Sequence, residues 1–174
     1  TNFYWFDGTP GTIPATYSAI ADAGAIFTDG GNAMGGRLGF HSPAASAKLA
    51  ALIQGTYVDG NNKKALEMAK VGRYAGFDNY ETVFAPTHTV GTLGGTPLVN
   101  GGAQAVTYAT AKDTWSQSLI TDGWTAAAAN RLKAGDVFTI ANVFAVNPNT
   151  KVSTGRLQTF TVLSDAASDG SGNL

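Results

Sequence analysis

The sequence predicts an α+β protein, with a helical N-terminal part followed by a small antiparallel β-barrel. Apolar residues recur at helical spacing in the first third of the chain. The last third instead carries short runs in which apolar and polar residues alternate, as in half-buried strands. Helices followed by strands favour an α+β arrangement over an alternating α/β one. We expect two domains, residues 1–79 and residues 80–174.

Three helices are expected in the first domain. The first starts near Pro14, which suits a first helical turn, and ends at the turn formers Asp29 to Asn32. Its apolar face is formed by four residues at helical spacing: Tyr17, Ile20, Gly24 and Phe27. The second helix runs from Pro43 to Ile53, with Ser42 as its N-cap, and the third runs from Lys63 to Lys70. These helices supply the first domain with most of its expected core.

The remaining elements are read from turn formers and alternation. A Gly-rich link is expected at Gly35 to Phe40, a strand at Glu81 to Ala85, a flexible segment at Thr92 to Gly102 and one helical turn at Thr125 to Asn130. Five further strands are predicted at 103–108, 114–121, 137–140, 143–146 and 157–162. Five or six strands are enough to close a small barrel.

Composition excludes several classes of protein. The 174 residues contain no Cys, so disulfides and thiolate metal sites are absent from the sequence. Charged residues make up only 13%, with a formal net charge of −1, which disfavours binding to nucleic acid or to an anionic membrane surface. The chain begins at Thr1 without Met, and we expect it to be a processed or truncated piece of a longer polypeptide.

The motifs of common enzymes are missing from the sequence. It has no Gly-x-Ser-x-Gly and no His-Glu-x-x-His, so nucleophilic or zinc-dependent hydrolysis has no support. His41 and His88 each lie beside a Pro-containing turn. Metal binding by the pair would need a third ligand, and we favour surface or capping roles for both. The prediction is a protein with no catalytic residue, no metal and no cofactor.

Two loops invite a ligand-binding interpretation. Gly91 to Thr96 resembles a phosphate loop but lacks the Lys that would follow its last Gly, so a flexible hinge is favoured. Asp165, Asp169 and Asn173 could suggest calcium, but the alternating acidic pattern and final Glu are absent. We expect a hairpin turn there, whose returning strand is missing from the chain.

The Trp residues and the charged loop residues have ordinary interpretations as well. Trp5, Trp115 and Trp124 could form a sugar-stacking surface, but core anchoring is favoured. Six charged residues of the second domain are expected to be solvated in loops: Lys112, Asp113, Lys133, Asp136, Lys151 and Arg156.

Several segments resemble a family of tailed-phage coat proteins. LKAGDVFTIANVFAVNP, STGRLQTFTV and SDGSGN are similar to the inserted β-domain of that family. Upstream, Phe40 to Pro43, Gly72-Arg73, Ala75 to Asp78 and Ala85 to Gly91 follow the order and spacing of its capsid fold. The sequence departs from the family in having His41-Ser42 where Asn before Pro is more usual, although Ser also caps well. The similarity covers about residues 9 to 173.

The resemblance implies a structural function. A coat subunit, or a fragment of one, would assemble with copies of itself into a phage or prophage head, with a scaffolding protein as a further partner. The location implied is the virion shell, after assembly in the bacterial host cytoplasm. Residues 80–174 would form the insertion domain, whose loops at 109–113 and 147–156 face neighbouring subunits. The candidate contact residues are Lys112, Asp113, Asn149, Lys151 and Arg156.

A second hypothesis remains open from the residues alone. Richness in Gly, Thr and Asn, together with three Trp, also fits a β-rich binding module such as an adhesin or a carbohydrate-binding domain. The long arm, extended loop and spine helix that the resemblance implies are not found in these residues. We therefore expect the chain alone to be monomeric or weakly associated.

Overall fold

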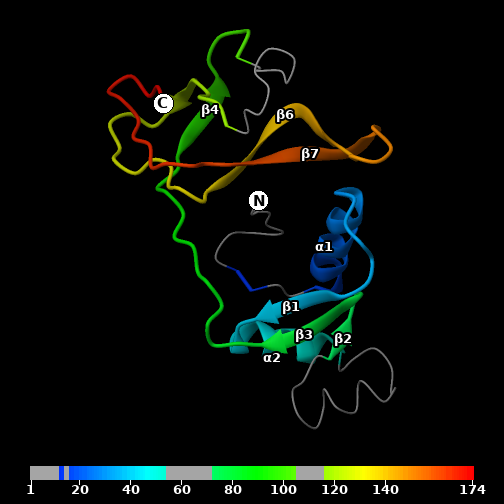
Figure 1. Cartoon of the computed structure of the whole chain (residues 1–174). Coiled ribbons are helices and arrows are strands. Elements are labelled where there is room, and N and C mark those ends of the chain that lie inside the picture. Colours follow the sequence, from blue (N-terminus) through cyan, green and yellow to red (C-terminus); the bar gives the residue numbers. More distant parts are fainter. Residues whose placement is uncertain (1–11, 14–15, 54–71, 105–115) are drawn as a thin grey trace. The chain divides into compact units, whose positions relative to one another are not determined.

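The computed structural model describes residues 12–13, 16–53, 72–104 and 116–174 (Figure 1). These residues fall into two compact units. The helical unit comprises the described residues up to Thr87, together with Thr139–Thr159, and the β unit comprises His88–Phe138 and Phe160–Leu174. Helices and strands are both present, as an α+β chain requires. The predicted third helix, Lys63 to Lys70, lies outside the described residues.

Helix α1 spans Tyr17–Asp29 and ends where the sequence predicted. The backbone N–H of Gly30 donates to the Ile26 carbonyl, and Gly31 adopts a φ of 78°, a left-handed conformation that suits Gly at a helix end. Gly24 faces inward, because a Cβ there would lie 3.4 Å from the Phe77 ring. The missing side chain lets the sheet approach the helix closely.

Helix α2 spans Pro43–Ile53 and confirms the predicted cap. The Ser42 hydroxyl oxygen accepts a hydrogen bond from the Ala45 backbone N–H at 3.3 Å. Leu49 is fully buried in this helix, and it forms a core with Ile20 and Phe77. The core of the helical unit therefore joins both helices to the neighbouring sheet.

A three-stranded sheet completes the helical unit, with strand order β1-β3-β2. Strand β1 (Arg37–His41) pairs in parallel with β3 (Phe77–Glu81), and β2 (Arg73–Tyr74) pairs with β3 in the antiparallel sense. The predicted Gly-rich link at 35–40 is thus largely a strand, and β3 ends at the residue where the predicted strand was expected to begin. Gly39 suggested a link, because Gly is uncommon inside a strand. In the structure it is required by close packing, since a Cβ at this position would lie 2.6 Å from the Asn79 side-chain oxygen.

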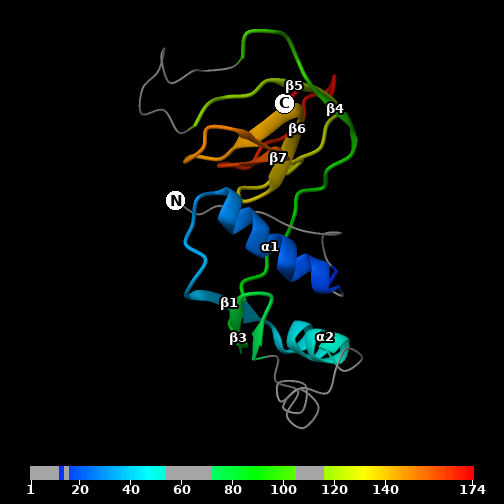
Figure 2. The same ribbon diagram turned by 90° about the vertical axis from the view of Figure 1, so that its right-hand side faces the viewer.

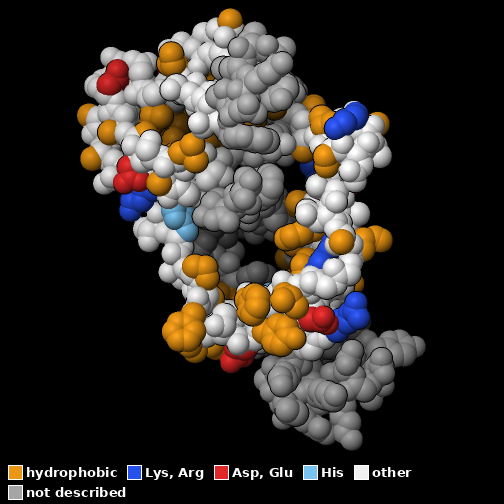
Figure 3. Space-filling view, in the orientation of Figure 1, with side chains coloured by type: hydrophobic (Ala, Val, Ile, Leu, Met, Phe, Trp, Pro, Cys, Tyr) orange, Lys and Arg blue, Asp and Glu red, His pale blue; other side chains and the backbone are white. Residues whose placement is uncertain are grey.

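One face of this sheet packs against the helices and the other is open. Leu38, Phe40 and Tyr80 lie on the open face, and the Phe40 and Tyr80 rings stack with centroids 5.8 Å apart. All three side chains are more than half exposed. In Figure 3, hydrophobic side chains gather over the part of the helical unit that holds β1 and β3.

The β unit begins with an antiparallel pair, β4 (Gly95–Val99) and β5 (Thr121–Trp124). Strand β4 falls inside the segment that was predicted to be flexible, and β5 starts where the predicted strand 114–121 was expected to end. Residues 172–174 run along β5, where Thr121 and Leu174 exchange two backbone hydrogen bonds of 2.7 and 2.9 Å (Figure 2). The segment that returns from the C-terminal turn is therefore present in the chain.

The hairpin of β6 (Val137–Val146) and β7 (Ser153–Thr161) forms a separate two-stranded sheet. The two predicted strands 137–140 and 143–146 are one strand, and it passes through Asn142 with a φ of 66°, which Asn tolerates better than most residues. The described residues do not form the predicted closed barrel, because β4-β5 and β6-β7 are two separate two-stranded sheets, and the isolated bridge between Leu132 and Ala166 lies beyond the ends of β6 and β7. Most of the predicted strand 103–108 lies outside them.

Candidate functional site

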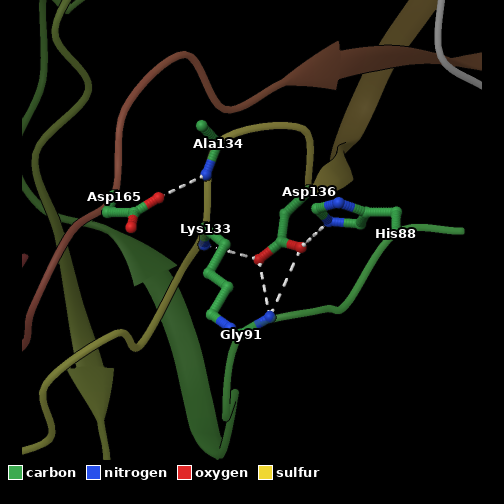
Figure 4. Close-up of polar contacts among 6 residues, drawn as sticks. All are labelled: His88, Gly91, Lys133, Ala134, Asp136 and Asp165. Carbon is green, nitrogen blue, oxygen red and sulfur yellow. Dashed lines mark hydrogen bonds and ion pairs between the residues drawn. The ribbon is translucent and has the colours of Figure 1, made fainter.

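A buried carboxylate organises the start of the β unit. The Asp136 side chain is only 4% exposed. It accepts hydrogen bonds from His88 Nε2 at 2.7 Å, from the Lys133 backbone N–H at 2.8 Å and from the Gly91 backbone N–H at 3.1 Å (Figure 4). The sequence had predicted a solvated loop residue here, and that prediction is wrong. Asp136 instead joins the turn before β6 to the segment that leads into β4.

The surroundings of Asp136 favour its ionised form. Burial raises the pKa of this carboxyl, but hydrogen bonds from the Lys133 backbone, from His88 and from the Gly91 backbone outweigh burial and bring the pKa below its ordinary value. The site therefore holds a stable negative charge in a water-poor position.

A buried cation lies a few residues before Asp136. Arg131 is 4% exposed, and its guanidinium donates to the Leu93 carbonyl, to the Thr125 carbonyl at 2.6 Å and to the Ser168 hydroxyl at 3.4 Å. The Ser168 hydroxyl in turn donates to the Thr125 carbonyl at 2.8 Å. Three segments that are distant in sequence are thus joined through one side chain, and the polar groups buried with it are satisfied.

The hydrogen bonds of Asp136 and Arg131 both fix residues 91–94, for which a flexible hinge was predicted. Leu93 N–H donates to the Arg131 carbonyl at 3.2 Å, and Thr92 N–H donates to the Asn130 carbonyl at 3.1 Å. A Cβ on Gly91 would lie 2.5 Å from the Arg131 carbonyl oxygen. The Gly residues of this segment therefore permit close backbone packing, and neither a hinge nor a phosphate loop describes them.

The C-terminal turn is organised by Asp169. Its carboxylate accepts from the backbone N–H groups of Ser171 and Asn173, each at 2.8 Å, and from the Asn173 side chain at 2.9 Å. These hydrogen bonds lower the pKa of Asp169. The predicted turn is confirmed. In the part of the chain described, no group of three or more His, Cys, Asp or Glu residues could hold a metal ion.

His41 and Trp124, two of the residues singled out in the sequence, have local partners. His41 Nε2 lies 2.7 Å from the Asn79 side-chain oxygen, and the Trp124 indole N–H donates to the Thr121 hydroxyl at 2.8 Å. Trp124 is half-buried in β5. Trp5 and Trp115 lie outside the described residues.

Three of the five candidate contact residues lie at or near the turn between β6 and β7. Asn149 and Lys151 are exposed, and the Asn147 side-chain oxygen accepts from the N–H groups of Asn149 and Thr150 at 2.9 and 3.0 Å. Arg156 is exposed on β7, with Nε 3.3 Å from the Asp29 carboxylate. Lys112 and Asp113 lie outside the described residues.

The structural roles of Arg131 and Asp136 were not predicted from the sequence. A signal was available, since Asp136 follows the turn former Gly135 directly and precedes an apolar strand, where a carboxylate often accepts backbone hydrogen bonds. Arg131 offered no comparable signal, because its partners are backbone carbonyls from other parts of the chain.

Neither described helix has the length and apolar character needed to cross a membrane. A comparison with curated proteins finds no significant match. The family model described as P22 coat protein, gene protein 5, matches residues 5–172, which is nearly the whole chain. The order of motifs at 40–91 and the β segments from Leu132 onward agree with that match. The chain therefore belongs to the P22 coat protein family, the structural subunits of bacteriophage capsids.

Proposed function

We propose that this capsid subunit uses the turn between β6 and β7 to contact neighbouring copies of itself. The family assigns the chain to a shell built by self-assembly. In such a shell, a surface that is repeated in every subunit meets equivalent surfaces many times. A contact of small free energy is therefore multiplied across the assembly.

The observation that carries the proposal is the internal order of an exposed turn. Residues 148–152 are exposed, yet the turn is closed by hydrogen bonds from Asn147 N–H to the Val152 carbonyl at 3.0 Å and from Lys151 N–H to the Asn147 carbonyl at 2.9 Å. Lys151 adopts a φ of 59°, which directs the chain back toward β7. A preorganised turn loses little conformational entropy when it binds.

The charges near the turn suit a polar contact. Lys151 is an exposed cation on a chain with few charges, and Asn149 adds amide donors and acceptors. Arg156 lies close to the turn, where its charge is shared with the Asp29 carboxylate of the same chain at 3.3 Å. Lys112 and Asp113 extend the proposal to a second loop on the basis of the resemblance alone. We also propose that the subunit acts through contacts without catalysis, that a scaffolding protein assists it, and that assembly takes place in the bacterial host cytoplasm.

Charge reversal tests the proposal. The coat protein carrying Lys151→Glu is assembled, and the particles are counted by negative-stain electron microscopy and sedimentation. We expect fewer closed shells and a larger fraction of free subunits. Lys48→Glu, the same change on an exposed face of α2, is the matched control. A wild-type yield of closed shells from Lys151→Glu would contradict the proposal.

A further inference from the structure

The loop that follows strand β4 carries a chemically reactive pair of residues. Asn100 comes directly after the strand, and in the whole sequence it is the one Asn that is followed by Gly. Asn100, Gly101 and Gly102 are exposed, and a Cβ added at either Gly would meet nothing within 4 Å. Figure 1 shows this segment, in green, leaving the end of β4. The backbone of the loop therefore has room to rotate.

We propose that Asn100 and Gly101 form a site of spontaneous modification, at which the Asn100 carboxamide is converted to a carboxylate. The two reacting groups are the Asn100 side chain and the Gly101 backbone nitrogen. Within the described part of the chain, neither group takes part in a hydrogen bond. Both are therefore available to react, and the only co-reactant is water.

The reaction has two steps. The Gly101 nitrogen gives up its proton to a base in the solvent and forms a bond to the side-chain carbonyl carbon of Asn100. The side-chain nitrogen takes up a proton and leaves as ammonia, which gives a five-membered succinimide ring. Water then adds to one of the two ring carbonyls and breaks its bond to nitrogen, so the product is aspartate or isoaspartate. Gly favours the first step because it has no Cβ to shield its nitrogen.

Gln104 restrains this reaction. Its side-chain N–H donates to the Asn100 backbone carbonyl at 2.6 Å and to the Ile120 carbonyl at 3.1 Å, and its side-chain oxygen accepts from the Ile120 N–H at 2.7 Å. Ring closure needs a rotation about the Cα–C bond of Asn100, because a chain that continues a strand directs the next nitrogen away from the side chain. That rotation moves the carbonyl that Gln104 holds. Gln104 therefore sets how often the reactive geometry is reached.

Comparable positions elsewhere in the chain lack this combination. Asp29 also precedes a Gly, but the Gly30 N–H donates to a backbone carbonyl at the end of α1 and is not free to attack. Asn149 is exposed, but it is followed by Thr150, whose branched side chain shields a nitrogen that already donates to a side-chain oxygen. The structure therefore singles out Asn100.

The modification changes the charge and the backbone of the subunit. It adds one negative charge to a chain whose formal net charge is −1. In the isoaspartate product the main chain also gains a methylene group directly after β4. Because a capsid holds many copies of its coat subunit, every copy carries the same site. A particle therefore gains negative charge as it ages.

Peptide mapping of the whole chain tests the site. The protein is incubated in neutral and in mildly alkaline buffer, and chromatography with mass spectrometry then quantifies aspartate and isoaspartate at positions 100 and 149. We expect conversion at Asn100, faster in the alkaline buffer, while Asn149 stays largely unchanged. Asn100→Gln, which could close only a larger ring, should accumulate no corresponding acidic species on anion exchange. No conversion at Asn100, or equal conversion at Asn149, would overturn the proposal.

Gln104→Leu tests the restraint. Conversion at Asn100 should become about threefold to tenfold faster, the range expected for the loss of one hydrogen bond. Gln158→Leu, the same substitution in β7, is the matched control and should leave the rate at Asn100 unchanged. The ratio of conversion at Asn100 to that at Asn149 separates a local effect from general unfolding. An unchanged or lower ratio in Gln104→Leu would overturn the role of Gln104.

Discussion

Each of the two units of the subunit is stabilised internally by a different kind of interaction. All the buried hydrophobic residues in the described part of the chain lie in the helical unit: Ile20, Ala45, Leu49, Ala50 and Phe77. Three of the four buried polar or charged residues lie in the β unit: Arg131, Asp136 and Ser168. Apolar burial is insensitive to pH, whereas a buried charge depends on its protonation and on every hydrogen bond it makes. The β unit should therefore be the one that responds to acid and to single polar substitutions.

The largest expected effect comes from Arg131. Arg131→Met removes the donors to the Leu93 and Thr125 carbonyls and leaves these acceptors in a buried position. We expect a loss of about 3 to 5 kcal/mol in the free energy of unfolding of the β unit. Urea denaturation measures it, followed by Trp124 fluorescence in a background in which Trp5 and Trp115 are changed to Phe.

Arg73→Met is the control for that experiment. Its side chain is 69% exposed, and its nitrogen lies 3.8 Å from the Asp78 carboxylate. Exposed ion pairs contribute about 0 to 1 kcal/mol, so little change is expected. If Arg131→Met were equally mild, buried charge would not hold the β unit together.

Leu49→Ala tests how much apolar burial stabilises the helical unit. Leu49 has no exposed surface and contacts the core of the helical unit. We expect a loss of about 2 to 5 kcal/mol, confined to the helical unit, because a cavity forms where the side chain was. Thermal unfolding combined with hydrogen exchange by mass spectrometry locates the loss. Leu38→Ala, on a side chain that is 53% exposed, should be much milder.

Asp136→Asn should destabilise the β unit by about 1 to 3 kcal/mol, since the amide cannot accept from all three donors. It should also reduce the acid sensitivity of the β unit, to which Asp169, whose pKa is lowered by its hydrogen bonds, contributes as well. The folded-state pKa of Asp136 is depressed, so its stabilisation is present above the ordinary Asp value and is lost as pH falls through the lowered value. Unfolding curves between pH 5 and 2.5 should flatten in the variant. Asp165→Asn, which alters one exposed acceptor, should leave the slope nearly unchanged.

The smallest expected effect is at the cap of α2. Ser42→Ala removes the acceptor for the Ala45 N–H and should cost about 1 kcal/mol, within the helical unit only. Circular dichroism during thermal unfolding measures this. Ser18→Ala, on the exposed side of α1, should stay within about 0.5 kcal/mol of the wild type. A cap effect that appeared in the β unit would show that the two units do not unfold separately.

The same contrast explains what the sequence could predict. The first two helices and the Ser42 cap follow from spacing and capping within a few residues, and the structure confirms them. Strand β1 was missed because Gly39 suggests a link, although the Gly makes room for Asn79 on a strand 40 residues away. Asp136 was expected in solvent because its partner His88 lies 48 residues earlier in the chain. Local rules do not report contacts of that separation.

The turn that carries the candidate contact residues was predictable, because it is formed by residues that are adjacent in the sequence. The turn at Asn147 to Thr150 follows from its turn formers, and the structure adds the Asn147 hydrogen bonds that order it. The resemblance in the sequence led to the family, and the match over residues 5–172 confirms it. The proposed contact also involves the surface of another subunit, and no pattern within one chain specifies that surface.

Hydrogen exchange followed by mass spectrometry during acid titration shows which of the two units depends on buried charge. Peptides from 88–104 and 116–138 report the β unit, and peptides from 16–53 and 72–87 report the helical unit. We predict that, after correction for intrinsic exchange, the β unit loses protection first as pH falls from 5 toward 2.5, while the helical unit keeps it. Loss of protection in both units at the same pH, or in the helical unit first, would show that buried charge does not make the β unit the more acid-sensitive one.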